Sequence, residues 1–325
     1  MRRVLVGVAL VPLIASASWA ATGPPIRFVR PVDHARHTYP ASYFDWWRLH
    51  AVDPKTGRWL LMEFQPEGAL WINVFDGEQV HGTGRQVLDP DDTTLRRTAK
   101  GWDVDLDNRP TVRGHLSLVG RSGVTVGPWR LGWQFAPGPL RWEHGKLWWS
   151  AVVPAGRLDG SFESYDGYKV DLSGWRGYLG HTWGKLILNS RAYQHWDFAA
   201  KHTGPRESWL LHGLEPRPGR DQDLRWWKPR DRVWQGVLVH TTARGVRVCR
   251  PKIVRRGWFT TYSIGLGDAG PYPARVTARC GSTSVSFRIW HADFKWGDEN
   301  RTHYWIGKGP TPDRRGFIQH ILPVE

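Results

Sequence analysis

Short runs in which apolar and polar residues alternate recur along almost the whole chain. Alternation of this kind is typical of β-strands with one buried face. No segment repeats its apolar residues at helical spacing over ten residues. Strands of this kind, separated by turns about every 8–12 residues, predict an all-β sandwich or barrel. The clearest expected strands lie at 58–65, 69–75, 101–106, 111–119, 123–135, 146–153, 208–214, 233–241, 246–253, 258–264, 274–280, 284–290, 302–307 and 316–322.

The first twenty residues have a different pattern, which is typical of a secretory signal peptide. Arg2 and Arg3 supply a basic start, residues 4–14 are apolar, and Ser18-Trp19-Ala20 resembles a cleavage site. The apolar run is shorter than the ~20 residues that a membrane-spanning helix needs. No later run reaches that length. We therefore expect an exported protein, periplasmic or extracellular, with no transmembrane span.

Tryptophan is unusually frequent, with 22 residues in a chain of 325. Because neighbouring side chains on a strand face opposite ways, one ring of each adjacent pair is expected inside a barrel and the other outside. Most tryptophans are expected in sheet cores, but a lumen lined by the others would suit an elongated apolar ligand. Trp46 and Trp149 are our candidates for ligand contact. The adjacent pairs are Trp46-Trp47, Trp148-Trp149 and Trp226-Trp227.

The formal net charge is +15, and the arginines that dominate it are scattered along the chain. Scattered charge is typical of a solvated surface. No recognisable nucleic-acid-binding module accompanies it, so we expect no nucleic-acid partner. The excess charge is also compatible with weak association with an anionic surface of the cell envelope.

Residues 153–185 carry the most specific pattern in the chain. The first half predicts a hairpin with Asp166-Gly167 at its turn. The second half, Gly-Tyr-Leu-Gly-His-Thr-Trp-Gly over 177–184, combines large aromatic residues, a histidine and three glycines. The glycines let the backbone bend, so we expect Tyr178, His181 and Trp183 to converge on one volume and to line an apolar cavity that binds the ligand. The alternative is a glycine-bent strand whose aromatic residues belong to an ordinary core.

This segment resembles the signature of the carotenoid 1,2-hydratase (hydroxyneurosporene synthase) family, which includes the AttH-like proteins and is related to tocopherol cyclases. Members carry V-P-x-G-x-x-x-G followed by G-x-G-Y-x-D-H-x-W-G. The matching residues here are Val153, Pro154, Gly156 and Gly160, then Gly177, Tyr178, His181, Trp183 and Gly184. Two outlying stretches agree less specifically, Phe44-Asp45-Trp46-Trp47 with an early E-W-W-Y segment and Gly316-Phe317-Ile318 with the closing strand.

The resemblance implies two tandem lipocalin-like (calycin) antiparallel β-barrels. After the signal peptide at 1–20, the first barrel would span 21–188 and contain the signature. The second would span 189–325. The resemblance also implies that Asp is tolerated at position 180, where this chain has Gly180.

The departure at Gly180 affects the chemistry that the resemblance implies. In the family, water adds to an alkene, or a ring closes on a protonated prenyl chain. Both reactions need a strong acid and aromatic faces that stabilise a carbocation. Gly180 cannot supply the family's acid. Asp197 is our best substitute, with an ordinary carboxylate paired to an arginine as its alternative. His181 could act as acid or base, or be a hydrogen-bonded structural histidine.

Two classes of function follow. One is an enzyme, a carotenoid 1,2-hydratase-like hydro-lyase or a cyclase, acting on an isoprenoid or polyketide-like lipophile through Tyr178, His181 and Asp197. A cyclase that works by holding a reactive conformer would tolerate the missing acid, and fungal decalin-forming cyclases resemble this fold. The other is a non-catalytic carrier or sensor of a lipophile in the cell envelope. Neither class implies a cofactor.

The chain has two cysteines, Cys249 and Cys280. Export would permit a disulfide between them, worth about 3–4 kcal/mol in the chain-entropy model. The alternative is two separate buried thiols. Two cysteines cannot form a zinc site alone, and no His-rich spacing nearby completes one, so we expect no metal.

Overall fold

All regular elements in the described residues of the computed structural model are β-strands. The structure describes residues 26–28, 43–64, 69–76, 79–87, 93–108, 112–121, 123–134, 141–164, 166–186, 193–216, 235–263, 267–288, 292–297, 302–307 and 316–323. The expected signal peptide and Trp226-Trp227 lie outside these residues. Among the described residues, no helix is long and apolar enough to span a membrane.

The first half of the chain forms one twelve-stranded sheet, in which all pairs are antiparallel. Its main path runs β5-β4-β3-β2-β12-β10-β8-β7-β6, while β9 and β11 pair with β10, and β1 pairs with β9. The bounds are β1 Ile26–Phe28, β2 Tyr43–Val52, β3 Trp59–Phe64, β4 Ala69–Asp76, β5 Gln79–Val87, β6 Thr93–Arg97, β7 Gly101–Asn108, β8 Val112–Gly120, β9 Val124–Gln134, β10 Arg141–Ser164, β11 Lys169–Asp171 and β12 Trp175–Leu186.

The second half forms a seven-stranded sheet, ordered β16-β15-β14-β13-β22-β21-β20, and a three-stranded sheet, β17-β18-β19. In the described residues, strands up to β12 pair only with one another, and so do strands from β13 on. The bounds are β13 Tyr193–Gly204, β14 Glu207–Pro216, β15 Gln235–Thr242, β16 Gly245–Cys249, β17 Lys252–Ser263, β18 Gly267–Cys280, β19 Thr283–Arg288, β20 Ala292–Gly297, β21 Thr302–Gly307 and β22 Gly316–Pro323.

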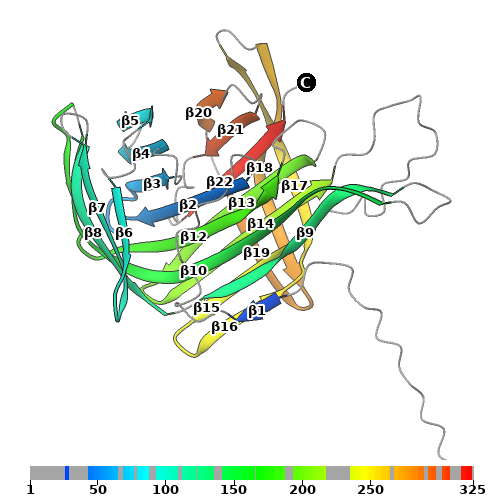
Figure 1. Cartoon of the computed structure of the whole chain (residues 1–325), viewed down its shortest axis with the longest axis horizontal. Coiled ribbons are helices and arrows are strands. Elements are labelled where there is room, and N and C mark those ends of the chain that lie inside the picture. Colours follow the sequence, from blue (N-terminus) through cyan, green and yellow to red (C-terminus); the bar gives the residue numbers. More distant parts are fainter. Residues whose placement is uncertain are drawn as a thin grey trace, which may run out of the picture.

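Both large sheets are open in strand order. The twelve-stranded path ends at β5 and β6, and the seven-stranded path ends at β16 and β20, with no ladder joining the ends among the described residues. The expectation of an all-β fold is confirmed, whereas the two closed barrels are not. Figure 1 shows the first sheet curling, so that β6–β8 rise on one side of the strands β2, β12 and β10.

Three apolar layers hold the sheets together. The inner face of the first sheet buries side chains of β2, β3, β4, β7, β8, β10 and β12, including Leu49, Val104 and Leu179. Its outer face packs against β13–β15, where Phe198 and Val239 contribute. The other face of the seven-stranded sheet packs against β17–β19. These layers follow from strand alternation, because residues at i and i+2 share a face.

A disulfide joins Cys249, at the end of β16, to Cys280, at the end of β18. It connects the three-stranded sheet covalently to the edge strand of the seven-stranded sheet. The side-chain hydroxyl of Ser208 on β14 donates to the carbonyl of Pro154 on β10, which ties the seven-stranded sheet to the first sheet. A disulfide and a hydrogen bond therefore join the three sheets to one another, in addition to the apolar contacts between them.

Candidate functional site

Strand β12, which carries the signature residues, lies in the middle of the first sheet between β2 and β10. His181 is paired with Trp47 of β2 on one side and with Ser150 of β10 on the other. Because side chains alternate along a strand, Tyr178 and Gly180 face one side of the sheet, and Leu179, His181 and Trp183 face the other.

On the inner face, His181 lies between tryptophan rings. Its ring is 4.0 Å from that of Trp47 and 4.6 Å from that of Trp183, and both contacts are stacked. Trp148 stacks on Trp183 at 6.3 Å, and Trp102 lies 5.3 Å from Trp47. These five residues form what we call the inner aromatic stack. Trp47, Trp102 and His181 are buried, whereas Trp148 and Trp183 are only partly buried.

A glycine on the neighbouring strand makes room for this stack. Gly127 of β9 has a φ of +139°, and a Cβ there would lie 2.7 Å from the Trp148 ring. A side chain at position 127 would be strained in this backbone conformation and would push the indole away. The indole of Trp148 therefore lies directly against the backbone of β9.

On the outer face, Tyr178 belongs to a different group of aromatic residues. The indole Nε1 of Trp149 donates a 3.0 Å hydrogen bond to its hydroxyl, and its ring lies 5.1 Å from Phe198 of β13. Trp149 also stacks on His212 of β14 at 4.6 Å. Arg48 of β2 covers Phe198 at 5.2 Å and Trp46 at 4.6 Å. We call these residues, together with Glu63, His50 and His202, the inter-sheet cluster.

Several titratable side chains are buried in the inter-sheet cluster. Arg48 donates a 2.6 Å hydrogen bond to Glu63 of β3, and the two form an ion pair. His50 of β2 stacks on His202 of β13, with their ring nitrogens 3.4 Å apart. Burial lowers the pKa of His202 to about 3. Burial is also the main reason that the pKa values of His50 and His212 lie well below their usual range. These histidines are therefore neutral at pH 7.

The three residues expected to be catalytic do not come together. His181 faces the inner aromatic stack, and Tyr178 faces the inter-sheet cluster on the opposite side of the same strand. Asp197 is buried on the other face of the seven-stranded sheet, where it pairs with Arg255 of β17. The expected convergence of Tyr178, His181 and Trp183 is therefore wrong, because an unbroken strand holds positions 178 and 181 on opposite faces.

The expected ligand contacts divide in the same way. Trp46 and Trp149 join Tyr178 in the inter-sheet cluster, while Trp183 joins His181 in the inner aromatic stack. The sequence analysis did not select the other titratable residues of this cluster, which are Arg48, His50, Glu63, His202 and His212. Only His212 lies between apolar, buried residues at i±2, Leu210 and Leu214. Arg48 and His50 are each other's neighbours on one face of β2, so alternation alone gave no clear signal for them.

The hydroxyl of Tyr178 occupies the space where a side chain at position 180 would start. A Cβ on Gly180 would overlap the Tyr178 hydroxyl oxygen and clash with its ring. Burial raises the pKa of Tyr178 above its usual value, so its phenol stays protonated. A group with a raised pKa is a weaker acid, so Tyr178 can donate a hydrogen bond but does not replace a strong acid.

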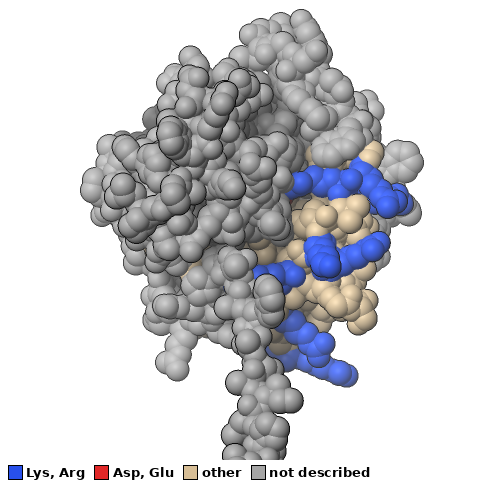
Figure 2. All heavy atoms as spheres, turned by 90° about the vertical axis from the view of Figure 1, so that its right-hand side faces the viewer, with Lys and Arg blue, Asp and Glu red and all other residues tan. Residues whose placement is uncertain are grey.

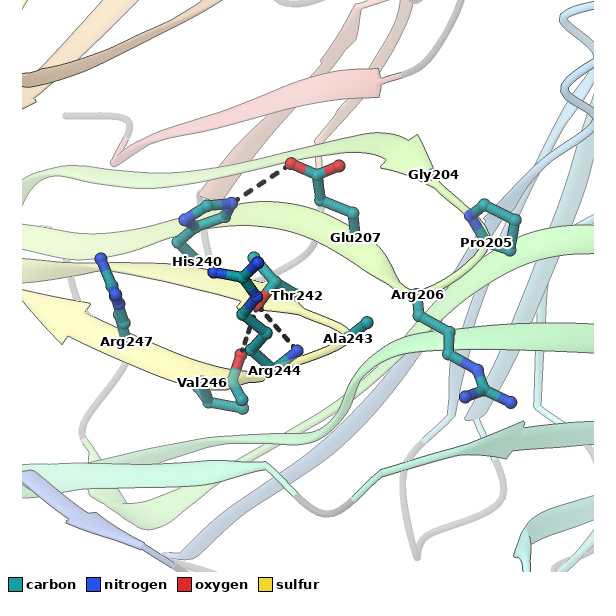
Figure 3. Close-up of a pocket in the computed structure, with 11 residues that line it drawn as sticks. Gly204, Pro205, Arg206, Glu207, His240, Thr242, Ala243, Arg244, Val246 and Arg247 are labelled. Atoms are coloured by element: carbon teal, nitrogen blue, oxygen red, sulfur yellow. Dashed lines mark hydrogen bonds and ion pairs between the residues drawn. The ribbon is translucent and has the colours of Figure 1, made fainter.

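A pocket of about 820 Å³ opens beside two turns of the seven-stranded sheet, the β13–β14 turn and the β15–β16 turn (Figure 3). Glu207 contacts His240 across it at 3.4 Å. Three arginines line it, Arg206, Arg244 and Arg247, and the lining includes none of the expected site residues. Among the described residues, no group of His, Cys, Asp and Glu could hold a metal ion.

Comparisons with known proteins identify the fold. No family model matches the chain, and no curated protein matches it by sequence. Kievitone hydratase from Nectria haematococca superimposes with a TM-score of 0.57 at 11% identity, over 91% of this chain and 94% of that protein. CghA with Sch210972 superimposes with a TM-score of 0.50 at 11% identity, over 87% and 89%. The chain shares the all-β, lipocalin-like fold of these proteins, as the sequence resemblance implied.

Proposed function

We propose that this protein binds an isoprenoid or polyketide-like lipophile on the inner aromatic stack. The observation that carries the proposal is the accessibility of Trp148 and Trp183, which remain partly exposed while the rest of the stack is buried. Aromatic rings contribute large apolar contact areas, and partly exposed rings are accessible to an apolar ligand. The inter-sheet cluster is less suitable, because Tyr178 and Trp149 are almost completely buried.

Native mass spectrometry of the purified protein would detect a co-purified lipophile. Binding can then be measured as quenching of tryptophan fluorescence by a probe, all-trans-retinol. We expect Trp183→Ala to weaken the affinity for retinol, as measured by quenching, at least about tenfold, because removing a central aromatic contact often has an effect of this size. The matched control is Trp209→Ala, because Trp209 is also partly buried but lies on β14 and stacks on His240. Equal affinities for the two variants would contradict the proposed site.

The second candidate function is catalysis, either hydration or cyclisation of the bound lipophile. The observation that favours it is the position of His181, a titratable group stacked between two indoles that could stabilise a cation formed nearby. The fold shared with kievitone hydratase supports the same class. Gly180 favours cyclisation over hydration, because the family's acid has no counterpart there and holding a reactive conformer requires none.

Chromatography with mass spectrometry of the lipophile, before and after incubation with the protein, distinguishes turnover from binding. Hydration adds the mass of one water to the lipophile, whereas cyclisation changes its retention time but not its mass. If His181 transfers a proton, His181→Gln should reduce turnover far more than it weakens retinol quenching, because the four indoles of the stack remain. Unchanged product formation in His181→Gln would leave binding, or cyclisation by shape alone, as the function.

We further propose that the chain is a divergent member of the carotenoid hydratase-like family, made of two lipocalin-like units at 21–188 and 189–325. It would be exported after cleavage of residues 1–20. The expected apolar signal run and cleavage site support export. Sequencing the N-terminus of the protein recovered from outside the cytoplasm would test it.

A further inference from the structure

The outer face of the three-stranded sheet carries basic residues in register across its strands. Arg256 of β17 is paired with Arg275 of β18, which is paired with Arg288 of β19. Four residues along β17, Lys252 is paired with Arg279. Directly paired residues share a face, so these five cations lie on one side of the sheet. Between the two rows, Thr277 is hydrogen-bonded to Ser286 at 2.7 Å.

No described acidic side chain balances these cations. Residues 250–257 and 273–288 contain no Asp or Glu, and none of the five cations has an ion-pair partner among the described residues. Figure 2 shows a side of the molecule on which Lys and Arg gather and no described Asp or Glu is in view. Like charges directly opposite each other on neighbouring strands are destabilising. Binding of an external anion would therefore reduce the repulsion among these five cations.

The opposite face of the same sheet fixes it to the rest of the protein. Val276, Ala278 and Phe287 are buried against the seven-stranded sheet. Arg255, which lies between the two basic rows in sequence, points inward to the buried carboxylate of Asp197. The disulfide from Cys249 to Cys280 holds the end of β18. The basic face is consequently presented on an anchored sheet.

We propose that the outer face of β17–β19 is a docking surface for an anionic phospholipid bilayer. With strands about 4.8 Å apart and about 3.3 Å per residue, the cations cover an area about 10 Å by 13 Å. Basic clusters near anionic lipid headgroups contribute additively to binding. The Thr277 and Ser286 hydroxyls add hydrogen-bonding groups between the rows. Such a surface would place a lipophile-binding protein next to the membrane where lipophiles are dissolved.

A bilayer fits this face better than a nucleic acid. The outward side chains described on it are Lys252, Val254 and Arg256 on β17, Arg275, Thr277 and Arg279 on β18, and Ser284, Ser286 and Arg288 on β19. Val254, Thr277 and Ser286 lie between the two basic rows, with no aromatic residue among them, although base stacking on aromatic rings is usual in sites for single-stranded nucleic acid. The described elements include no helix that could enter a duplex groove.

The test is co-sedimentation of the full chain with vesicles. We expect binding to vesicles of equal parts phosphatidylserine and phosphatidylcholine, weakened by salt, and none to phosphatidylcholine alone. Arg256→Gln/Arg279→Gln should weaken binding about 25-fold, because each basic residue near an anionic surface is worth about fivefold. The matched control is Lys100→Gln/Arg121→Gln, which removes the same charge from exposed positions of the first sheet.

The outcomes are distinct. Equal binding by wild type and Arg256→Gln/Arg279→Gln would overturn the proposal. An equal loss of binding in both double variants would also overturn it, because the net charge of the protein, and not this face, would then determine binding. Absence of vesicle binding, with a single-stranded oligonucleotide bound instead, would assign the face to nucleic acid. Thermal melting of each variant checks folding. Retinol quenching should be the same in all variants, so failure of the docking surface does not affect the proposed ligand site.

Discussion

The hydroxyl of Tyr178 fills the position from which a side chain at residue 180 would project. Both residues lie on β12 two positions apart and share the face that packs on the second half of the chain. The sequence resemblance implied that Asp is tolerated at position 180. The structure indicates the opposite in this chain, because glycine at 180 and the inward-packed phenol at 178 depend on each other.

We predict that Gly180→Ala destabilises the protein by about 1–3 kcal/mol, as overpacking of a filled core does. Gly180→Asp should cost more, since it also buries a carboxylate. The measurement is the free energy of unfolding in urea. In a Tyr178→Ala background the clash is removed, and Gly180→Ala should become neutral or stabilising because alanine is better than glycine within a strand. A Gly180→Ala protein as stable as wild type in the Tyr178 background would show that the phenol moves freely.

How far the sequence predicted this molecule depends on the scale considered. Alternation was enough for the all-β class and for strands such as β9, expected at 123–135 and found at Val124–Gln134. β5 was not predicted, because the glycines in Gln79–Val87 interrupt its alternation. β10 runs on to Ser164 through register shifts near Val153, where the sequence suggested a break. A β-bulge keeps the hydrogen-bonded ladder continuous past Pro154 and Gly156, residue types that usually mark the end of a strand.

The candidate site was predicted in composition but not in arrangement. The residues of 177–184 do lie at the centre of a sheet, yet the three glycines do not bend the strand enough to bring Tyr178 and His181 together. The buried pair Arg48–Glu63 could not be recognised as a pair from the sequence alone, because their register across β2 and β3 depends on tertiary packing.

We predict that the protein loses stability as the pH falls below about 6.5. In the folded state the pKa of His202 is about 3, and burial holds those of His50 and His212 well below their usual range. In the unfolded state each returns to about 6.5, so the unfolded chain binds more protons and stability falls with pH between those values. His202 should cost about 2 kcal/mol at pH 5 relative to pH 8, and His50 and His212 should add to the loss in the same direction.

Urea unfolding at a series of pH values measures this slope. His202→Gln should reduce it, whatever the variant does to stability at pH 8, because one titrating group is removed. Exposed His115, which pairs with Asp105, provides the control variant His115→Gln. An unfolding free energy that is flat from pH 8 to pH 5 would contradict the buried, neutral state of these histidines.

We predict that Glu63→Gln destabilises the protein by about 3–5 kcal/mol, because it leaves the Arg48 guanidinium buried without its countercharge. Replacing both partners, Arg48→Met with Glu63→Leu, should cost much less, since well-packed apolar pairs often substitute for buried ion pairs. Arg157→Gln breaks the more exposed pair with Asp159 and should cost about 1 kcal/mol or less. If Glu63→Gln behaves like Arg157→Gln, water or a mobile group must compensate the charge.

The disulfide should matter most to the sheet that carries the basic face. Cys249 and Cys280 are 31 residues apart in sequence, and closing a loop of that size stabilises by about 3–4 kcal/mol in the chain-entropy model. We therefore predict that Cys249→Ala/Cys280→Ala lowers the free energy of unfolding by about that amount. Hydrogen exchange should show the loss first in β17–β19, whose other attachments among the described residues include the apolar layer and the ion pair of Arg255 with Asp197. Uniform loss of protection across β2, β10 and β12 instead would mean that the three sheets unfold as a single cooperative unit, and that the bond contributes to the whole chain rather than to one layer.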